Sequence, residues 1–587
     1  MTNTLLTLHD PEAARGYYAA GLWRRDTLYT LLCEHAARRP DDFALRDGAT
    51  RLGWAALLQL VDAVAADLHA AGLKRGERVA VWLPSRVESV VVLLAASRNG
   101  YVCNPSLHQN YTVAEIVELL VRTRAAALFV QPGYGADART SDIFSAVAEL
   151  PSLRRVYSLG EGPANAVPFP PQPPPCPSLP GLDPGITGEA EKGGPTRGLP
   201  PVDANPDKIV YLAFTSGTTG TPKGVMHSDN TLLANGRAMV ADWHHDARTI
   251  LLSLSPMSHH IGAVAVEQMM AAGLELVVNA PPPGMTPLDW IIETGATYVM
   301  GVPTHAMDIL GEMRRRGLDR LDAVTVFYMA GSPIPREVAK AFLDRGVTPQ
   351  NVYGMTENGS HQYTRPGDPA ETIVATCGRA CAAYEIRLWD QDNPDVEVAP
   401  GEVGEIGGRG ACLTLGYFDN QAATEDSFNR EGWFMSGDLG RLDAEGCLEI
   451  VGRKKDLIIR GGHNIHPAHI EDLAMRHPAV ARVAAFAVAD QRLGEKVCLS
   501  VILHEGTGAE AHELLTHLHE AGLSRYDMPE YFIAMTAYPL TASGKILKRE
   551  LVEWARTGRI RPVPVRWTGP EGTNQSGGEQ SVGAEEG

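Results

Sequence analysis

The chain has 587 residues, of which 44% are hydrophobic and 21% are charged, a balance typical of soluble globular proteins. Its length exceeds what one hydrophobic core supports, so about two to four domains or subdomains are expected. The 52 basic and 70 acidic residues give a formal net charge of -18, which argues against non-specific nucleic-acid binding as the main role.

The cysteines and the apolar runs further restrict the kinds of protein that this sequence can encode. The eight cysteines form no Cys-x-x-Cys pair, and Cys377 and Cys381 lack a second His or Cys pair that would complete a zinc site, so we expect buried or incidental thiols. The first residues lack the basic start and long apolar core of a signal peptide, and no run approaches the ~18 apolar residues of a membrane helix. We therefore expect a cytoplasmic protein without a membrane span.

The first part of the chain alternates helical and strand patterns. Apolar residues at three- and four-residue spacing predict helices at 28–38 and 55–71, and a further helix is expected at 85–99. Apolar runs at 78–83 and 125–130 predict buried strands. Because strand and helix alternate, this half predicts a parallel-rich sheet covered by helices.

Between about 160 and 205 the composition changes to proline and glycine. The run Pro-Phe-Pro-Pro-Gln-Pro-Pro-Pro-Cys-Pro cannot sustain a helix or a sheet, which indicates an inserted surface connection with polyproline character. Recognition by a partner domain that binds proline-rich segments is the alternative that composition leaves open.

The stretch 215–224 reads Thr-Ser-Gly-Thr-Thr-Gly-Thr-Pro-Lys-Gly and follows an apolar run, 209–214, that predicts a buried strand. A loop at the carboxyl end of such a strand lies where open α/β sheets place their ligands. Glycines expose backbone N–H groups, hydroxyls donate to phosphate oxygens, and a lysine supplies positive charge. The predicted phosphate-binding residues are Thr215, Ser216, Gly217, Thr218, Thr219, Gly220 and Lys223. By itself, the stretch leaves an ordinary flexible loop open as the alternative.

This stretch resembles the phosphate-loop signature of the adenylate-forming superfamily, which includes acyl-CoA synthetases, adenylation domains and luciferases. The resemblance implies further motifs downstream, and Val-Tyr-Gly-Met-Thr-Glu at 352–357 resembles the second of them. There it implies that Tyr353 stacks on adenine, Thr356 donates to the α-phosphate and Glu357 holds a magnesium ion. An aromatic face suits a purine, and a hard carboxylate oxygen suits magnesium.

Two further segments contribute to the implied nucleotide site. An apolar strand at 323–330 ends in Gly331 and Ser332, where the family has the small-residue turn of its adenine pocket, and glycine lets a flat base approach the backbone. In Trp-Phe-Met-Ser-Gly-Asp, the resemblance implies that Asp438 binds the ribose hydroxyls. The alternative is that Asp438 only forms an Asx turn, which is the usual role of an aspartate in a turn after an apolar strand.

The resemblance implies that the chain continues into a mobile domain. Arg453 would contact ribose, and Lys455, two residues on, would be the hinge about which the small domain rotates. Gly462 would let a pantetheine arm approach closely, and Lys545, in a Ser-Gly-Lys turn, would reach the active site during adenylation. Alternating patterns predict strands near 483–488, 496–503 and 531–535 and a helix at 509–521.

The segment 255–262, Ser-Pro-Met-Ser-His-His-Ile-Gly, corresponds to the family's acyl pocket. The resemblance places the pocket histidine on His259, with His260 left open as a substitute, and 300–304 is expected to line the pocket. No aspartate stands at 255–267, which argues against an α-amino acid substrate. This segment and 17–24 resemble the subgroup that includes cyclohexanecarboxylate CoA ligases.

The expected fold class is α/β, or α+β overall. We expect a large N-terminal domain at 1–454, with parallel-rich sheets, helices and a small antiparallel β-barrel near 401–417. A small mobile α+β domain is expected at 455–566, and a disordered tail at 567–587.

The implied activity is a two-step ligase reaction. A small-molecule carboxylic acid reacts with ATP and Mg²⁺ to give an acyl-adenylate and pyrophosphate, and the thiol of coenzyme A then takes the acyl group. No nucleic-acid partner is expected, and the sequence leaves a homodimer open. Three alternatives also remain open: an acyl-AMP ligase that loads a separate carrier protein, a luciferase-like oxygenase, and a catalytically silent scaffold relative.

Overall fold

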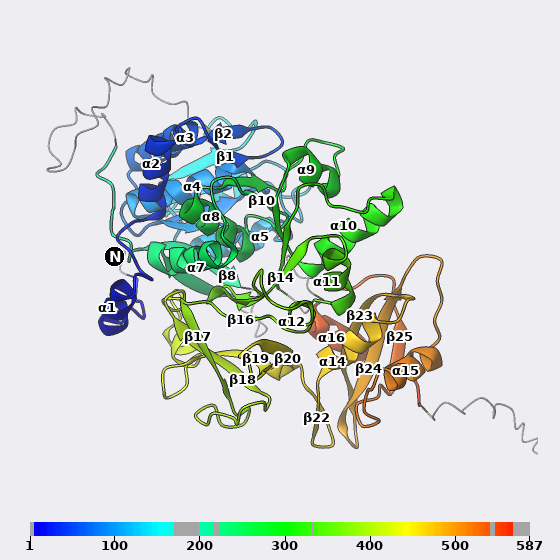
Figure 1. Ribbon diagram of the computed structural model, residues 1–587. Helices are drawn as coiled ribbons and strands as arrows, with labels where there is room; N and C mark the ends of the chain where they lie inside the picture. Colours follow the sequence, from blue (N-terminus) through cyan, green and yellow to red (C-terminus); the bar gives the residue numbers. More distant parts are fainter. Residues whose placement is uncertain (1–4, 170–198, 216–221, 332–333, 541–545, 568–587) are drawn as a thin grey trace, which may run out of the picture. The chain divides into compact units, whose positions relative to one another are not determined.

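The computed structural model describes residues 5–169, 199–215, 222–331, 334–540 and 546–567. The chain divides into two compact units, a larger one that includes Met1–Ile450 and a smaller one that begins at Val451 (Figure 1). Within the described residues, no helix is both long enough and apolar enough to cross a membrane.

The larger unit contains a seven-stranded sheet with the order β7-β6-β5-β3-β4-β8-β9. Its strands pair in parallel from β7 to β8, and β9 alone runs antiparallel to its neighbour. The strands are β3 (Arg78–Trp82), β4 (Val102–Asn104), β5 (Ala127–Val130), β6 (Arg155–Ser158), β7 (Val167–Pro168), β8 (Ile209–Thr215) and β9 (Lys223–Ser228).

A second sheet of nine strands has the order β16-β15-β14-β13-β12-β10-β11-β1-β2. It is parallel from β14 to β1 and antiparallel at both edges. The strands are β1 (Phe43–Arg46), β2 (Arg51–Gly53), β10 (Ile250–Ser253), β11 (Glu275–Val278), β12 (Tyr298–Gly301), β13 (Val326–Met329), β14 (Thr348–Met355), β15 (Gly359–Tyr363) and β16 (Arg379–Ala380).

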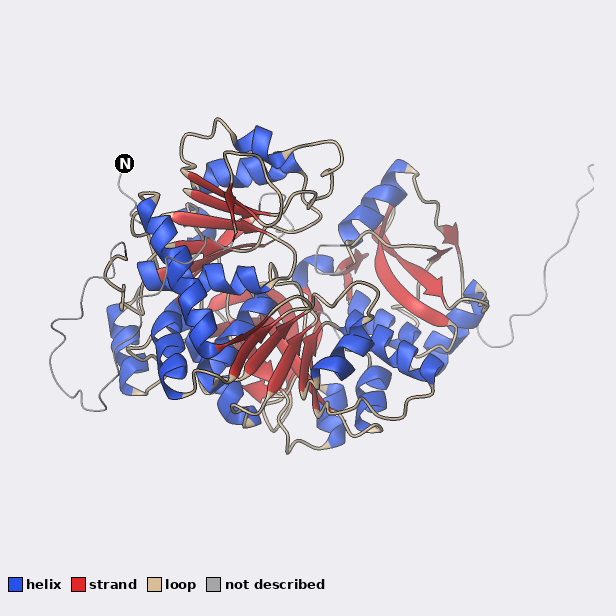
Figure 2. Ribbon diagram, turned by 90° about the horizontal axis from the view of Figure 1, so that it is seen from above, coloured by secondary structure: helices blue, strands red, loops and turns tan. Residues whose placement is uncertain are grey.

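Helices cover these sheets, as Figure 2 shows. They form where the apolar spacing predicts: α2 spans the predicted 28–38, and α3 and α4 lie within one or two residues of prediction. Helices of this unit are α1 (Pro11–Ala19), α2 (Leu28–Arg38), α3 (Trp54–Ala70), α4 (Val87–Asn99), α5 (Val113–Thr123), α6 (Ile143–Val147), α7 (Asp229–Trp243), α8 (His260–Ala272), α9 (Pro287–Thr294), α10 (Pro303–Arg316), α11 (Arg336–Leu343), α12 (Ala370–Ala375) and α13 (Gln421–Glu425).

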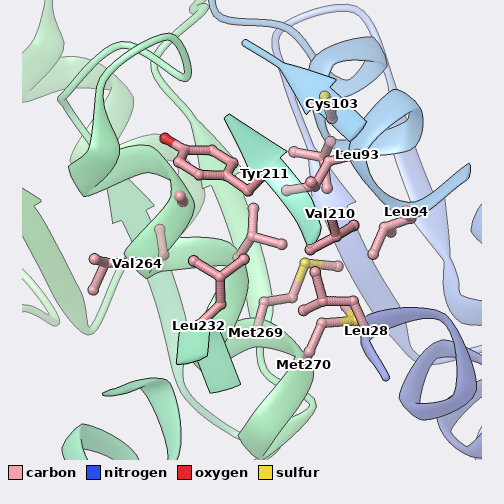
Figure 3. Close-up of a cluster of buried hydrophobic side chains, with 14 of the residues drawn as sticks. Leu28, Leu93, Leu94, Cys103, Val210, Tyr211, Leu232, Val264, Met269 and Met270 are labelled. Carbon is pink, nitrogen blue, oxygen red and sulfur yellow. The ribbon is translucent and has the colours of Figure 1, made fainter. Parts of the chain in front are cut away.

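The main core of the larger unit is built from helices and from strands of both sheets, and Figure 3 shows the part of it beside the first sheet. Every residue of α4 is buried, so this helix is covered on all sides rather than on one face. The side chains labelled in Figure 3 come from α2, α4, β4, β8, α7 and α8: Leu28, Leu93, Leu94, Cys103, Val210, Tyr211, Leu232, Val264, Met269 and Met270.

The predicted small barrel region is an antiparallel sheet of four strands in the order β17-β18-β19-β20, with β17 and β20 at its edges. Trp389 on β17 packs against Trp433 with ring centroids 5.7 Å apart. The strands are β17 (Tyr384–Trp389), β18 (Gly404–Gly410), β19 (Phe434–Leu442) and β20 (Leu448–Arg453).

The smaller unit is an α+β domain with its own apolar core. In its sheet, β24 pairs with β23 antiparallel and with β25 in parallel. Its elements are the 3₁₀ turn Lys454–Asp456, β21 (Ile458–Arg460), β22 (His463–Ile465), α14 (Pro467–Met475), β23 (Val480–Asp490), β24 (Gly494–Leu503), α15 (Ala511–Glu520), β25 (Tyr531–Ala534), α16 (Lys548–Thr557) and β26 (Val563–Pro564).

Several histidines of the larger unit are buried in their neutral form. Burial lowers the pKa to about 4 for His227 and His245 and to about 3 for His361. Neither ring nitrogen of His361 has a hydrogen-bond partner in the described structure, and the ring packs 4.1 Å from that of Tyr384. A proton on this imidazole would therefore be buried without compensation.

Acid should destabilise the fold, because these buried histidine rings bind a proton less readily in the folded state than in the unfolded state. An unfolded histidine binds a proton near pH 6.5, whereas folded His361 does so only near pH 3, so the unfolded state binds more protons between these values. The free energy of unfolding therefore falls as the pH drops through this window, by about 1.4 kcal/mol per pH unit for each such group. In thermal unfolding from pH 8 to 5, His361→Phe should show a shallower decline in midpoint than the wild type. An equal decline would contradict the buried neutral ring.

Candidate functional site

The predicted phosphate loop lies within a β-hairpin. β8 ends at Thr215 and β9 begins at Lys223, and these two residues are directly paired across the antiparallel ladder. The loop therefore leaves the carboxyl end of β8, as expected, but returns as a neighbouring strand. Five predicted residues, Ser216, Gly217, Thr218, Thr219 and Gly220, lie outside the described residues.

A second hairpin, formed by β14 and β15, carries Thr356 and Glu357 in its turn. Asn358 closes this turn, because its Oδ1 accepts from the Met355 N–H at 3.0 Å and its own N–H donates to the Met355 carbonyl at 3.2 Å. The sequence analysis missed Asn358. Its Asn-Gly pair with Gly359, which has φ +66°, is a recognised hairpin signal that could have revealed it.

The backbone of this hairpin is tightly packed at Gly354. A Cβ at this position would lie 1.9 Å from the carbonyl oxygen of Gly359. Glycine is therefore required at Gly354 by the close approach of the facing strand. The close approach of the two strands thus holds the turn that carries Thr356 and Glu357.

Tyr353 and Asp438 are joined by a direct hydrogen bond. The Tyr353 hydroxyl donates to Oδ2 of Asp438, on β19, at 3.0 Å, and both residues are buried. Burial, followed by the nearby Asp438 carboxylate, raises the pKa of the Tyr353 phenol well above its usual value. The structure thus brings together the residues that the sequence analysis assigned to adenine and to ribose, although they lie 85 positions apart.

Glu357, Tyr417 and Lys223 form a line of contacts. The Tyr417 hydroxyl donates to Oε1 of Glu357 at 3.0 Å, and the Lys223 ammonium lies 4.6 Å from the centroid of the Tyr417 ring. Burial raises the pKa of the Glu357 carboxyl, while the Tyr417 bond and the Lys223 charge act in the opposite direction. The sequence analysis missed Tyr417, since nothing in its local sequence marks a contact with a residue 60 positions away.

His227 fixes the backbone at Thr356. Its Nε2–H donates to the Thr356 carbonyl at 2.7 Å, and since a carbonyl only accepts, Nδ1 accepts from the Thr231 hydroxyl at 3.0 Å. The ring of His260 stacks on His227, with centroids 5.5 Å apart and an interplanar angle of 20°. His227, like Asn358 and Tyr417, was not among the residues predicted from sequence.

The predicted pocket histidine, His259, lies at the N-cap of α8, where Nδ1 accepts from the Ile261 N–H at 3.4 Å. His260, the alternative left open, is buried and lies 3.4 Å from the Tyr211 hydroxyl through Nδ1. The preceding segment is held by Ser258, which bonds Nδ1 of His108 at 3.0 Å. Through the stack on His227, His260 is thus linked to Thr356.

The remaining predicted residues are distributed over both units. Gly331 follows β13 with φ +94°, and Ser332 lies outside the described residues. In the smaller unit, Arg453 ends β20 and Lys455 lies in the 3₁₀ turn. Gly462, with φ +87°, lies between β21 and β22, and a Cβ there would meet no heavy atom within 4 Å. Lys545 lies outside the described residues.

Across the described ranges, no group of three or more His, Cys, Asp or Glu side chains could hold a metal ion. Glu357 is nevertheless suited to Mg²⁺, because magnesium is usually bound by one or two carboxylates together with phosphate oxygens and water.

The family models of AMP-binding enzymes match most of this chain. The AMP-binding enzyme model matches residues 32–418, and the model of the AMP-binding enzyme C-terminal domain matches residues 469–545. The matched ranges contain both hairpins and the segment before α8. The chain therefore belongs to the AMP-binding enzyme family, the adenylate-forming superfamily that its motifs resemble.

Relatives cover nearly the whole chain. A medium-chain fatty-acid–CoA ligase of Escherichia coli (strain K12) is 30% identical, over 93% of this chain and 94% of the relative. A salicyl-AMP ligase / salicyl-S-ArCP synthetase of Mycobacterium tuberculosis (strain ATCC 25618 / H37Rv) is 31% identical, over 92% and 93%. ATP-bound MatB from Rhodopseudomonas palustris shares the fold, with a TM-score of 0.74 and 24% identity over 90% of this chain and 99% of that one.

The close approach of the Gly359 carbonyl to Gly354 leads to a prediction about stability. Gly354→Ala should lower the free energy of unfolding by about 1–3 kcal/mol, because the new methyl group clashes with the Gly359 carbonyl and the hairpin must open. Gly367→Ala is the matched control, since a Cβ at Gly367 would meet no atom within 4 Å. Denaturant unfolding of both variants measures the difference, and equal stabilities would contradict the close approach.

Proposed function

We propose that this protein is an ATP-dependent carboxylic acid:CoA ligase that forms an acyl-adenylate and pyrophosphate and then transfers the acyl group to coenzyme A. The observation that carries the proposal is the β14–β15 hairpin of an AMP-binding enzyme. It sets Tyr353 against Asp438, with Thr356 and Glu357 in the adjoining turn. An aromatic ring beside a carboxylate suits a nucleoside, and a hydroxyl beside a hard oxygen ligand suits its phosphates.

The first half-reaction brings two anions together, so the site must cancel charge. The Thr356 hydroxyl donates to the α-phosphate, and Lys223 with the 215–224 loop restrains the departing pyrophosphate. Glu357 would hold Mg²⁺, which supplies positive charge to the phosphate oxygens when bound. The Tyr417 hydroxyl orients this carboxylate, since it donates to one of its two oxygens.

The second half-reaction uses the smaller unit. Rotation about Lys455 withdraws Lys545 and brings the Gly462 turn to the acyl-adenylate, a gating step of the kind that often limits turnover. The positive φ of Gly462 and the open space around it support the approach of a pantetheine arm there. The thiol then attacks the acyl carbonyl, and AMP leaves.

A second candidate acceptor is a carrier protein. A relative named salicyl-AMP ligase / salicyl-S-ArCP synthetase covers 92% of this chain at 31% identity, and a 2,3-dihydroxybenzoate-AMP ligase of Bacillus subtilis (strain 168) covers the same share at 30%. The first name favours a version of the reaction in which a carrier-protein thiol replaces that of coenzyme A, and the second names only formation of the adenylate.

Pyrophosphate release tests both versions. The purified protein is given ATP, Mg²⁺ and a panel of aliphatic, alicyclic and aromatic acids, with and without coenzyme A. We expect release that depends on one class of acid and rises with coenzyme A, together with formation of the acyl thioester. Release without any effect of coenzyme A would favour the carrier protein, and no release with any acid would refute the ligase.

Lys545 should act in only one half-reaction. Lys545→Ala should lower adenylate formation by at least about tenfold, because a charge that acts at the α-phosphate is lost. It should spare thioester formation from supplied acyl-adenylate. Lys548→Ala is the matched control, since Lys548 pairs with Glu471 at 2.8 Å and should change neither rate. Equal loss of both half-reactions in Lys545→Ala would remove the assigned role.

A further inference from the structure

Glu267, in α8, is a buried carboxyl group without a partner. The residue is 1% exposed, and neither Oε1 nor Oε2 has a hydrogen-bond partner in the described structure. Burial raises the pKa of the carboxyl well above its usual value, so the neutral acid is favoured. A buried polar group that lacks hydrogen bonds costs free energy, so each such group calls for an explanation.

The backbone of α7 packs closely against Glu267. α7 and α8 lie side by side (Figure 1), and a Cβ at Gly236 of α7 would lie 2.6 Å from Cβ of Glu267. Two tyrosine hydroxyls lie near enough for Glu267 to raise their pKa further, those of Tyr211 and Tyr328. Each is engaged elsewhere, the first with His260 at 3.4 Å and the second with Ser360 at 2.7 Å.

Position along α8 connects Glu267 to the candidate site. It follows His260 by seven residues, two helical turns, so the two residues share a face and are separated by about 10 Å. Val264 lies between them on this face, and in Figure 3 the Tyr211 hydroxyl is directed away from Leu93 and Leu94. The face therefore has a polar end at His260, an apolar middle and a second polar end at Glu267.

The next residue adds an unpaired acceptor. Gln268 is buried, and its Oε1 has no hydrogen-bond partner in the described structure. Its Nε2–H donates to the Val264 carbonyl at 3.3 Å and contacts Sδ of Met300 at 3.4 Å. Met300 belongs to the segment that the sequence predicts as pocket lining. An amide oxygen accepts, whereas a neutral carboxyl both donates and accepts, so the unpaired atoms of Gln268 and Glu267 suit a group that can do both.

We propose that Glu267 recognises a hydroxyl group at the end of the substrate acid remote from its carboxylate. This inference rests on the proposed ligase function and specifies its substrate class, a hydroxy acid whose middle is an apolar ring or short chain. The substrate would lie along the α8 face, with its carboxylate toward Thr356 and its hydroxyl at Glu267. A hydroxyl both donates and accepts, so it complements a neutral carboxyl better than an ammonium group does.

The test uses pairs of acids that differ by one remote hydroxyl, such as 4-hydroxycyclohexanecarboxylate and cyclohexanecarboxylate, or 4-hydroxybenzoate and benzoate. The wild type should show a kcat/KM at least about tenfold higher for the hydroxy member of one pair. Glu267→Leu should bring that ratio near one by lowering kcat/KM for the hydroxy acid alone. Glu267→Gln preserves shape and one acceptor, so it should retain part of the preference.

Glu88→Gln is the matched control. Glu88, in α4, is also buried and has a pKa raised by burial; its Oε2 has no hydrogen-bond partner in the described structure but lies 3.6 Å from the Arg86 guanidinium, and its amide variant should leave the ratio unchanged. If Glu267→Leu fails to fold, Glu267→Gln still tests the idea, since its ratio should fall several-fold at an unchanged kcat/KM for the plain acid. Equal ratios in the wild type and Glu267→Gln, or a wild type that prefers plain or amino-bearing acids, would overturn the proposal.

Failure of this inference can be separated from failure of the ligase function. A protein that releases pyrophosphate with plain acids but ignores the remote hydroxyl is a ligase in which Glu267 is only a structural residue. A protein that releases none with any acid loses the proposed function, and the substrate inference falls with it.

Discussion

The turn between β14 and β15 is the constraint on which the candidate site depends. Its geometry is set by backbone contacts: Asn358 closes it, Gly354 lets the facing strand approach, and His227 holds the Thr356 carbonyl. These backbone contacts fix the segment 353–357 so that its side chains point to different partners. Tyr353 reaches Asp438 and Glu357 meets Tyr417, although those partners belong to later parts of the chain.

Burial gives these groups their chemical character. The carboxyl of Glu357 has a raised pKa because of burial, and His227 is held neutral for the same reason. A neutral imidazole has one donor and one acceptor nitrogen, and His227 uses both, with Thr356 and with Thr231. Protonation would remove the acceptor and add an uncompensated charge beside the turn. The positioning network and the stability of the fold therefore respond to acid together.

Much of the fold could be predicted from sequence, because it depends on local patterns. The helix at 28–38 and the strands β5 and β24 follow from apolar spacing and from the alternation of elements. β4 was missed, since its three residues, Val102–Asn104, are too few to form a pattern. β9 was missed because Lys-Gly-Val-Met-His-Ser resembles a loop, and only its ladder with β8 makes it a strand.

The residues of the candidate site also fall into two groups: those that could be predicted from sequence and those that could not. Motif residues such as Tyr353 and Asp438 could be selected from sequence because the resemblance extends over their neighbours, and the structure then brings the two within 3.0 Å. His227 and Tyr417 could not, because their significance lies in contacts with residues 129 and 60 positions away. The roles assigned to Lys545 and to the loop residues 216–220 stay predictions of the resemblance.

The pairing of α7 with α8 links the Thr356 turn, the proposed nucleotide side of the site, to the proposed acyl side at α8. His227 immediately precedes the capping residue of α7, Ser228, and contacts Thr356, whereas Gly236, two turns along α7, allows α8 to approach at Glu267. α8 in turn begins at His260, which stacks on His227. A shift of α8 along α7 would therefore move the Glu267 end and the His260 end together, so in the proposed ligase the residues that select the acid are also those that fix its position relative to Thr356.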